Sequence, residues 1–185
     1  LVGPFPPELC RLDALRDLDL ECNDLRGAVP DAVGRLESLR SLLLGGNAIE
    51  SVPASLGRLA LLETLTLNEN KLVSVPREIG TCASLRTLLL FSNALVAVPE
   101  TLGRLRNLRT LQLGRNRIED APASLAECAS LEHLNLRRNK LTRVPEAWGE
   151  MRSLASLSLR GNELVAVPAS LARCPELVAL DLAQK

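Results

Sequence analysis

One pattern recurs through nearly the whole chain: Leu-x-x-Leu-x-Leu-x-x-Asn-x-(Leu/Ile), followed a few residues later by Val-Pro or Ala-Pro. Each copy starts 23 residues after the last, except that the first copy carries one extra residue. A unit this short cannot bury its own apolar face, so a fixed period of this length predicts stacked structural repeats. We therefore interpret residues 1–185 as a single domain with partial repeats at both ends and seven full repeats, which start at Leu15, Leu39, Leu62, Leu85, Leu108, Leu131 and Leu154.

Each copy predicts a short strand followed by a turn. In Leu-x-Leu the side chains alternate, so both leucines point inward while the residue between them faces outward. Stacked copies then form a parallel sheet, and the chain turns after each strand, where backbone amides need new partners. A side-chain amide both donates and accepts. We therefore expect a buried ladder formed by Asn23, Asn47, Asn70, Asn93, Asn116, Asn139 and Asn162.

The recurring proline predicts a helical turn on the outer side of each repeat, because proline lacks an N–H and fixes φ. Segments such as residues 54–59 carry leucines three apart, as an inward-facing turn requires. The predicted fold class is therefore α/β, a solenoid curved into an arc, with a parallel β-sheet on the concave face and short helical turns on the convex face. Seven repeats give an inner face about 30 to 35 Å long.

This pattern resembles the 23-residue class of leucine-rich repeats, and the resemblance covers nearly the whole chain. The class is similar to the repeat regions of intracellular scaffolds in Ras signalling, of phosphatase-regulating subunits and of the recognition parts of larger multidomain proteins. Protein binding on the concave surface is what these share, and the resemblance implies it here. The chain departs from the pattern at Ala121, which replaces the usual Val, and at core leucine positions held by Cys82, Cys128, Met151 and Cys174.

The composition limits the classes of partner that this chain could bind. Lysine plus arginine equals aspartate plus glutamate, 22 each, so no global charge attracts nucleic acid or an anionic membrane. No apolar run is long enough to cross a bilayer. Neither a glycine-rich phosphate loop nor a nucleophile–base set is present, so we expect no enzyme activity and no cofactor or metal. A protein or peptide partner is the remaining class.

The five cysteines lack the close spacing of a metal site or a redox motif. Cys82, Cys128 and Cys174 share one repeat position, two layers or about 10 Å apart, which is too far for a disulfide. We interpret them as small core residues. The sequence also lacks an Asn-x-Ser/Thr acceptor. An intracellular, most simply cytoplasmic, location fits these features best.

The outward-facing strand residues form the candidate binding site, and their charge changes along the array. The first copy offers acidic groups, the middle offers apolar groups where solvent is expected, and the last copies are basic. We hypothesise that Leu89 and Phe91 form an apolar anchor, flanked by arginines that engage carboxylates or phosphates; the alternative is scattered charge without a function. The candidate residues are Asp17, Asp19, Glu21, Leu43, Leu89, Phe91, Arg115, His133, Arg137, Arg138 and Arg160.

Four other features have simpler interpretations. His133 is the only histidine, and without a paired nucleophile it is expected to be a surface residue rather than a base. Trp148 takes a core-facing position, so we expect packing, with a convex binding spot as the alternative. Cross-strand charge pairing explains two further sets, Arg40 with Glu63 and Arg86, and Arg109 with Glu132.

Three functions remain open. The leading one is a protein-binding scaffold or adaptor that uses the concave face. The alternatives are a structural subunit of a large assembly, and the recognition domain of a larger enzyme whose catalytic part lies outside these residues. Neither end shows a polar capping unit, so we expect the chain to be part of a longer protein, with a flanking domain or subunit over its ends.

Overall fold

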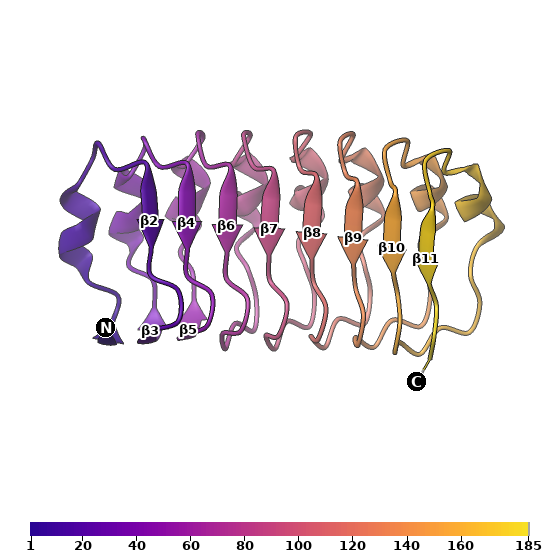
Figure 1. The fold of residues 1–185 in the computed structure, drawn as a ribbon, viewed down its shortest axis with the longest axis horizontal. Helices are drawn as coiled ribbons and strands as arrows, with labels where there is room; N and C mark the ends of the chain where they lie inside the picture. Colours follow the sequence, from indigo (N-terminus) through magenta and orange to yellow (C-terminus); the bar gives the residue numbers. More distant parts are fainter. Residues whose placement is uncertain (185) are drawn as a thin grey trace.

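A computed structural model describes residues 1–184, which form a single curved row of repeats (Figure 1). Eight strands within that range build one parallel sheet, in which each strand pairs in register with the next, as Leu65 does with Leu88. The strands are β2 (Asp17–Asp19), β4 (Ser41–Leu43), β6 (Thr64–Thr66), β7 (Thr87–Leu89), β8 (Thr110–Gln112), β9 (His133–Asn135), β10 (Ser156–Ser158) and β11 (Ala179–Asp181).

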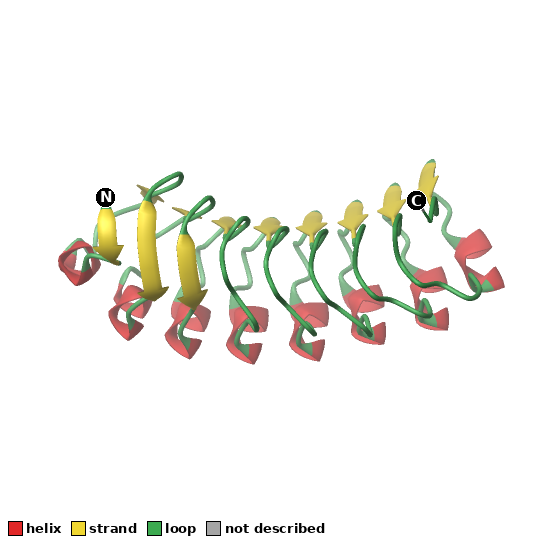
Figure 2. Ribbon diagram, turned by 90° about the horizontal axis from the view of Figure 1, so that it is seen from below, coloured by secondary structure: helices red, strands yellow, loops and turns green. Residues whose placement is uncertain are grey.

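The outer side of every repeat is a five-residue 3-10 helix, and Figure 2 shows these helices along the convex edge with the sheet along the concave edge. The expected helical turn is therefore a 3-10 turn, and proline is the residue before it, as Pro99 is before Glu100. The helices are η1 (Pro7–Arg11), η2 (Asp31–Arg35), η3 (Ala54–Arg58), η4 (Arg77–Thr81), η5 (Glu100–Arg104), η6 (Ala123–Glu127), η7 (Glu146–Glu150) and η8 (Ala169–Arg173).

Leucine fills the space between the sheet and the helices. In the central repeats the repeated leucines have no exposed surface, as at Leu88 and Leu111. The cysteines expected in the core lie there as well: Cys82, Cys128 and Cys174 are buried and free of disulfides. Trp148 is fully buried, and its indole Nε1 donates to the carbonyl oxygen of Pro122 at 3.1 Å. This confirms its core-packing interpretation.

The asparagine ladder is confirmed by its hydrogen bonds. Asn116 is typical: its Oδ1 accepts from the N–H of Leu95 at 3.0 Å, and its Nδ2 donates to the carbonyls of Leu90 (3.0 Å) and Leu113 (2.9 Å). The side chain thus joins its own repeat to the preceding one. Burial is less uniform than expected, since Asn116, Asn139 and Asn162 are buried whereas Asn23, Asn47, Asn70 and Asn93 are half-buried.

A second, three-stranded sheet covers one side of the first repeats and was not predicted. It consists of β1 (Val2–Pro4), β3 (Asp24–Ala28) and β5 (Ala48–Ser51), visible as the three long arrows in Figure 2. The extra residue of the first copy lies in β3, and the register shifts between Gly27 and Ala28. Gly27 has φ +75, a backbone conformation that glycine adopts without a steric penalty. The extra residue and its glycine are the sequence signal for this sheet.

Candidate functional site

The concave sheet presents the residues that flank each buried strand leucine. In β7, Leu88 is buried while Thr87 and Leu89 on either side of it are half-buried. The outward positions of neighbouring strands lie in register, so Leu89 is beside Thr66 on one side and Gln112 on the other. Side chains from different repeats therefore meet in columns across this face.

The predicted site residues all lie on or at the rim of this face, but their exposure differs. Solvent exposure of the apolar members was expected and is wrong: Leu43, Leu89 and Phe91 are half-buried, as is Glu21. On a concave surface the side chains of adjacent strands converge, so each covers part of its neighbours. The exposed members are Asp17, Asp19, Arg115, His133, Arg137, Arg138 and Arg160.

Phe91 and Arg137 occupy the same repeat position two copies apart, with Gly114 between them. A Cβ atom added to Gly114 would lie 3.0 Å from Cγ of Arg137. The Arg137 side chain therefore lies over Gly114, in the gap between its own strand and Phe91. This glycine leaves room for the Arg137 side chain beside the column position of Phe91, and it was not among the predicted site residues. The sequence signal was the absence of a side chain at this position between Phe91 and Arg137.

Polar side chains fix the floor between the apolar residues and the arginines. Asn135 Nδ2 donates to Gln112 Oε1 at 2.8 Å, and Asn135 Oδ1 accepts from the backbone N–H of Arg137 at 3.0 Å. These bonds hold the backbone of Arg137 in place. Gln112 and Asn135 were also outside the predicted site, although they continue the column that contains Leu89.

Some carboxylates at the acidic end accept hydrogen bonds from the protein itself. Glu21 Oε1 accepts from the hydroxyl of Thr66 at 2.5 Å, across the position of Gly45, and Thr66 is buried. Asp19 accepts from the backbone N–H of Glu21 at 3.0 Å through one carboxylate oxygen. Glu21 therefore bonds within the sheet, and the carboxylates of Asp17 and Asp19 stay exposed at this end of the face.

At the basic end, Arg115, Arg137 and Arg138 form no ion pair with any residue in the described range 1–184. Arg115 and Arg138 also have positive φ, 55 and 53. The same repeat position holds Gly46 and Gly161, which adopt this conformation without strain. Three cationic groups on two neighbouring repeats thus have no ion-pair partner in the described chain.

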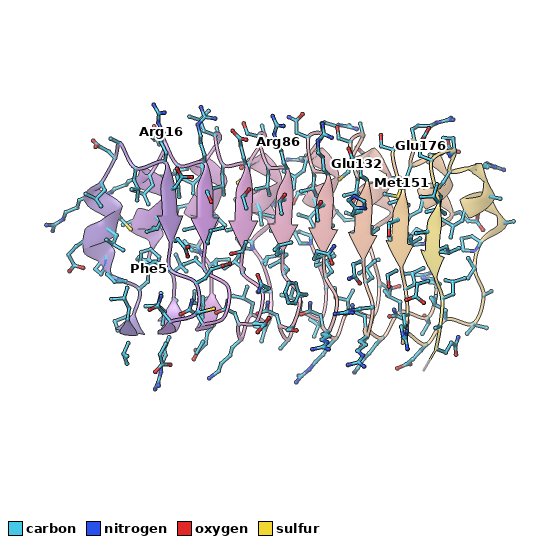
Figure 3. The ribbon with its side chains drawn as sticks, viewed as in Figure 1. Phe5, Arg16, Arg86, Glu132, Met151 and Glu176 are labelled. Atoms are coloured by element: carbon cyan, nitrogen blue, oxygen red, sulfur yellow. The ribbon has the colours of Figure 1, made fainter. Side chains whose placement is uncertain are left out.

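The edge where the strands begin has the opposite character. Glu63 lies 2.6 Å from a guanidinium nitrogen of Arg40 and 3.7 Å from one of Arg86, and Arg109 pairs with Glu132 at 2.6 Å. The predicted cross-strand pairing is confirmed, and Figure 3 shows Arg86 and Glu132 along this edge. Its charges compensate one another, which makes it a poor candidate for binding an ionic partner.

The nucleophilic side chains are not arranged for chemistry. Burial raises the pKa of Cys82 and of Cys128 to about 11, which keeps both thiols neutral. Each Sγ instead lies within hydrogen-bonding distance of a backbone carbonyl, that of Leu56 for Cys82 at 3.4 Å. His133 is exposed, as expected. Residues 1–184 contain no group of three or more His, Cys, Asp or Glu side chains placed to hold a metal ion.

Comparison with known families identifies the chain. It matches the model of a leucine-rich repeat region over residues 4–119, and that of a leucine rich repeat over residues 106–164 and 130–184. The chain therefore belongs to the leucine-rich repeat family. The narrower 23-residue intracellular class stays a prediction. No curated protein matches the chain significantly in sequence. In the described part of the chain, no helix has the length and apolar character needed to cross a membrane.

Solved structures from plants and bacteria share the fold. The leucine-rich repeat ectodomain of the membrane receptor kinase GASSHO1/SCHENGEN3 from Arabidopsis thaliana is 31% identical, with a TM-score of 0.87 over 100% of this chain and 24% of that chain. The plant peptide hormone receptor RGFR1 is 30% identical, with a TM-score of 0.91 over 100% of this chain and 31% of that one. An internalin from Listeria monocytogenes, 21% identical, has a TM-score of 0.81 over 98% of this chain and 52% of its own, and shows the fold alone. The chain thus spans about a quarter to a third of the plant receptors.

Proposed function

We propose that this chain is a protein-interaction module that binds a protein or peptide along its concave face, in a scaffold or adaptor role. The observation that carries the proposal is that the Arg137 side chain, which forms no ion pair in the described chain, lies over Gly114, one repeat from the half-buried Phe91 in the same column. Aromatic and arginine side chains are the residue types that contribute most to protein interfaces.

The arrangement defines the chemistry of the partner. An apolar side chain fits against Leu89 and Phe91, and a carboxylate or phosphate about 10 Å further along reaches Arg115, Arg137 and Arg138. The opposite end of the face carries exposed carboxylates, so a positively charged segment is favoured there. An extended peptide therefore has one preferred direction along the sheet. Two similar structures hold a bound ligand: GASSHO1/SCHENGEN3 is in complex with CASPARIAN STRIP INTEGRITY FACTOR 2, and the peptide hormone receptor RGFR1 is in complex with RGF2.

A second candidate function is the recognition domain of a larger enzyme. It is favoured by the likeness to GASSHO1/SCHENGEN3, a membrane receptor kinase of whose leucine-rich repeat ectodomain this chain covers 24%. The site and its ligand would be the same in both cases. The two candidate functions differ in whether a catalytic domain is joined to the repeats. The complete coding sequence would show whether such a domain is present.

We also propose an intracellular location. It is supported by the absence of an Asn-x-Ser/Thr acceptor and by five free cysteines, of which Cys22 is exposed. An exposed thiol without a disulfide partner persists in a reducing compartment. Fractionation of the native cell tests the proposal, and recovery of the protein in the secreted fraction would contradict it.

The proposed binding face is tested by affinity purification with mass spectrometry, using a Phe91→Ala, Arg137→Glu, Arg138→Glu variant. We expect this variant to lose a specific partner that the unaltered chain retains. A matched control changes one apolar residue and two arginines away from the face: Leu61→Ala, Arg58→Glu, Arg104→Glu, all of them exposed positions. Equal loss in both variants, or in neither, would refute the concave site and favour a structural-subunit role through the ends or the convex side.

A further inference from the structure

A groove of about 640 Å³ opens on the side of the molecule where the chain leaves the sheet and approaches the convex helices. Three consecutive repeats line it, through residues 97–100, 120–123 and 143–146. Its volume lies within the range of about 300–1,000 Å³ that is typical of ligand sites. It is separate from the concave face, because its lining comes from the first residues of η5, η6 and η7 and the segments before them rather than from the strands.

The groove follows from a local change in the repeat. The repeats on either side have Val-Pro-Glu at this point, ending in Glu100 and Glu146, whereas the middle repeat has Ala121-Pro122-Ala123. Two small side chains thus replace a valine and a glutamate, which leaves a hollow between two glutamates. Among the seven full repeats, Ala121 is the only residue that replaces the valine before proline.

Packing explains part of this change. Trp148 is buried below the groove, and its indole N–H holds the carbonyl oxygen of Pro122. The large indole accounts for a small residue at Ala121. It does not account for the exposed Ala123 or for the two glutamates around it. The bonded tryptophan also makes the floor rigid, so a ligand would not have to order it.

The charges around the groove select a cation. Glu100, Asp120 and Glu146 supply three carboxylates, while Arg143 is the only basic residue in the lining. Arg143 Nη2 lies 3.1 Å from a carboxylate oxygen of Asp120 and compensates it. Within residues 1–184, Glu100 and Glu146 have no ion pair. Two unpaired carboxylates therefore remain above an apolar floor.

We propose that this groove binds an arginine side chain from an extended segment of a partner protein. The methylene stem packs on the floor formed by Val98, Ala121 and Val144, and the guanidinium lies between Glu100 and Glu146. Arginine fits better than lysine because its planar group donates to two carboxylates at once. The site does not depend on the concave face, and it gives the module a second contact with the same or another partner.

The test is a titration of the isotope-labelled chain, followed by amide NMR shifts, with two probes. One is the peptide acetyl-Ala-Leu-Arg-Leu-Ala-amide, and the other carries neutral citrulline in place of arginine. We expect saturable shifts at Asp120, Ala121 and Ala123 with the arginine peptide, and at least tenfold weaker binding of the citrulline peptide. Absent shifts, equal shifts with both peptides, or shifts confined to the concave face would overturn the proposal.

Two variants separate the groove from general surface charge. Ala123→Arg places a cation in the hollow at an exposed position and should abolish binding, whereas Ala54→Arg, at the same repeat position in η3, should leave binding unchanged. Replacing both Glu100 and Glu146 by glutamine should weaken binding at least fivefold while circular dichroism stays constant. Binding that survives Ala123→Arg, or that is lost equally in Ala54→Arg, would overturn the assignment.

Discussion

Replacement of Asn116 by alanine tests how the asparagine ladder holds adjacent repeats together. The carbonyls of Leu90 and Leu113 each accept from a second asparagine, Asn93 at 3.1 Å and Asn139 at 3.0 Å respectively, so both retain a partner in the variant. The N–H of Leu95 bonds to Asn116 Oδ1 and to no other acceptor in the described chain. Asn116→Ala therefore leaves one buried donor without a partner and removes three bonds to carbonyls that keep another donor, the third a longer one of 3.4 Å to the carbonyl of Gly114.

The expected loss of stability follows from these lost hydrogen bonds. An unsatisfied buried donor costs about 1–3 kcal/mol, and the loss of shared bonds adds to it, so Asn116→Ala should lower the free energy of unfolding by about 2–4 kcal/mol. Asn107→Ala is the matched control, because Asn107 donates a single bond to the carbonyl of Ala83 at an exposed site. We expect less than about 1 kcal/mol there. Urea denaturation followed by circular dichroism measures both.

A double-mutant cycle makes the reasoning refutable. Asn93 and Asn116 are the two donors to the carbonyl of Leu90, so removing both orphans that carbonyl, which neither single variant does. The double variant should exceed the sum of the single costs by about 1–2 kcal/mol. Asn93 and Asn139 share no carbonyl, and their costs should add within about 0.5 kcal/mol. Additive costs for the adjacent pair would refute the shared-carbonyl account.

Four further predictions follow from burial and contacts. Of the five thiols only Cys22 should react rapidly with a thiol reagent in the folded chain, and all five should react in denaturant; a second fast thiol contradicts this. Because burial raises the pKa of Cys82 from 9.0 to about 11, the unfolded state ionises first, so stability should fall between pH 9 and 11. In urea titrations at these pH values, the free energy of unfolding of Cys82→Ala should fall by about 2–3 kcal/mol less than that of the unaltered chain. Gly34→Ala should cost about 1–3 kcal/mol, since its Cβ would lie 2.6 Å from the backbone oxygen of Ser55; an unchanged urea midpoint contradicts it. Glu63→Gln should change stability by less than about 1 kcal/mol, because its ion pairs are exposed.

Periodicity made most of the fold predictable. The leucine and asparagine positions determine which residues point inward, and the structure places Leu88 and Asn116 as the repeat requires. The second sheet was missed because it depends on one inserted residue and on the positive φ of Gly27, which a repeat average hides. The helix type was also not predictable, since a five-residue turn after proline is compatible with either an α or a 3-10 geometry.

The candidate site was predictable only in part. The repeat position of each residue fixes the column it occupies, and Leu89 lies in register with Thr66 and Gln112 as the repeat requires. Burial on that face depends on curvature and on neighbouring side chains, and this is why Leu89 and Phe91 were expected to be exposed but are half-buried. The role of Gly114 also depends on the direction of the Arg137 side chain, which no pattern of residue types specifies.

In a repeat protein, the fold is encoded by the positions that every copy shares, so information about a partner must lie where one copy differs from its neighbours. Gly114, between Phe91 and Arg137 in one column, is such a difference, and Ala121 with Ala123, between Glu100 and Glu146, is another. Each difference leaves a gap between side chains of the adjacent repeats. Apolar and cationic side chains border the gap at Gly114, and apolar and anionic side chains border the gap at Ala121 and Ala123. The two gaps lie on different sides of the same repeats, and their opposite charges mean that one ligand segment cannot satisfy both. A partner that engages both must therefore present an acidic segment to the sheet and a basic one to the groove.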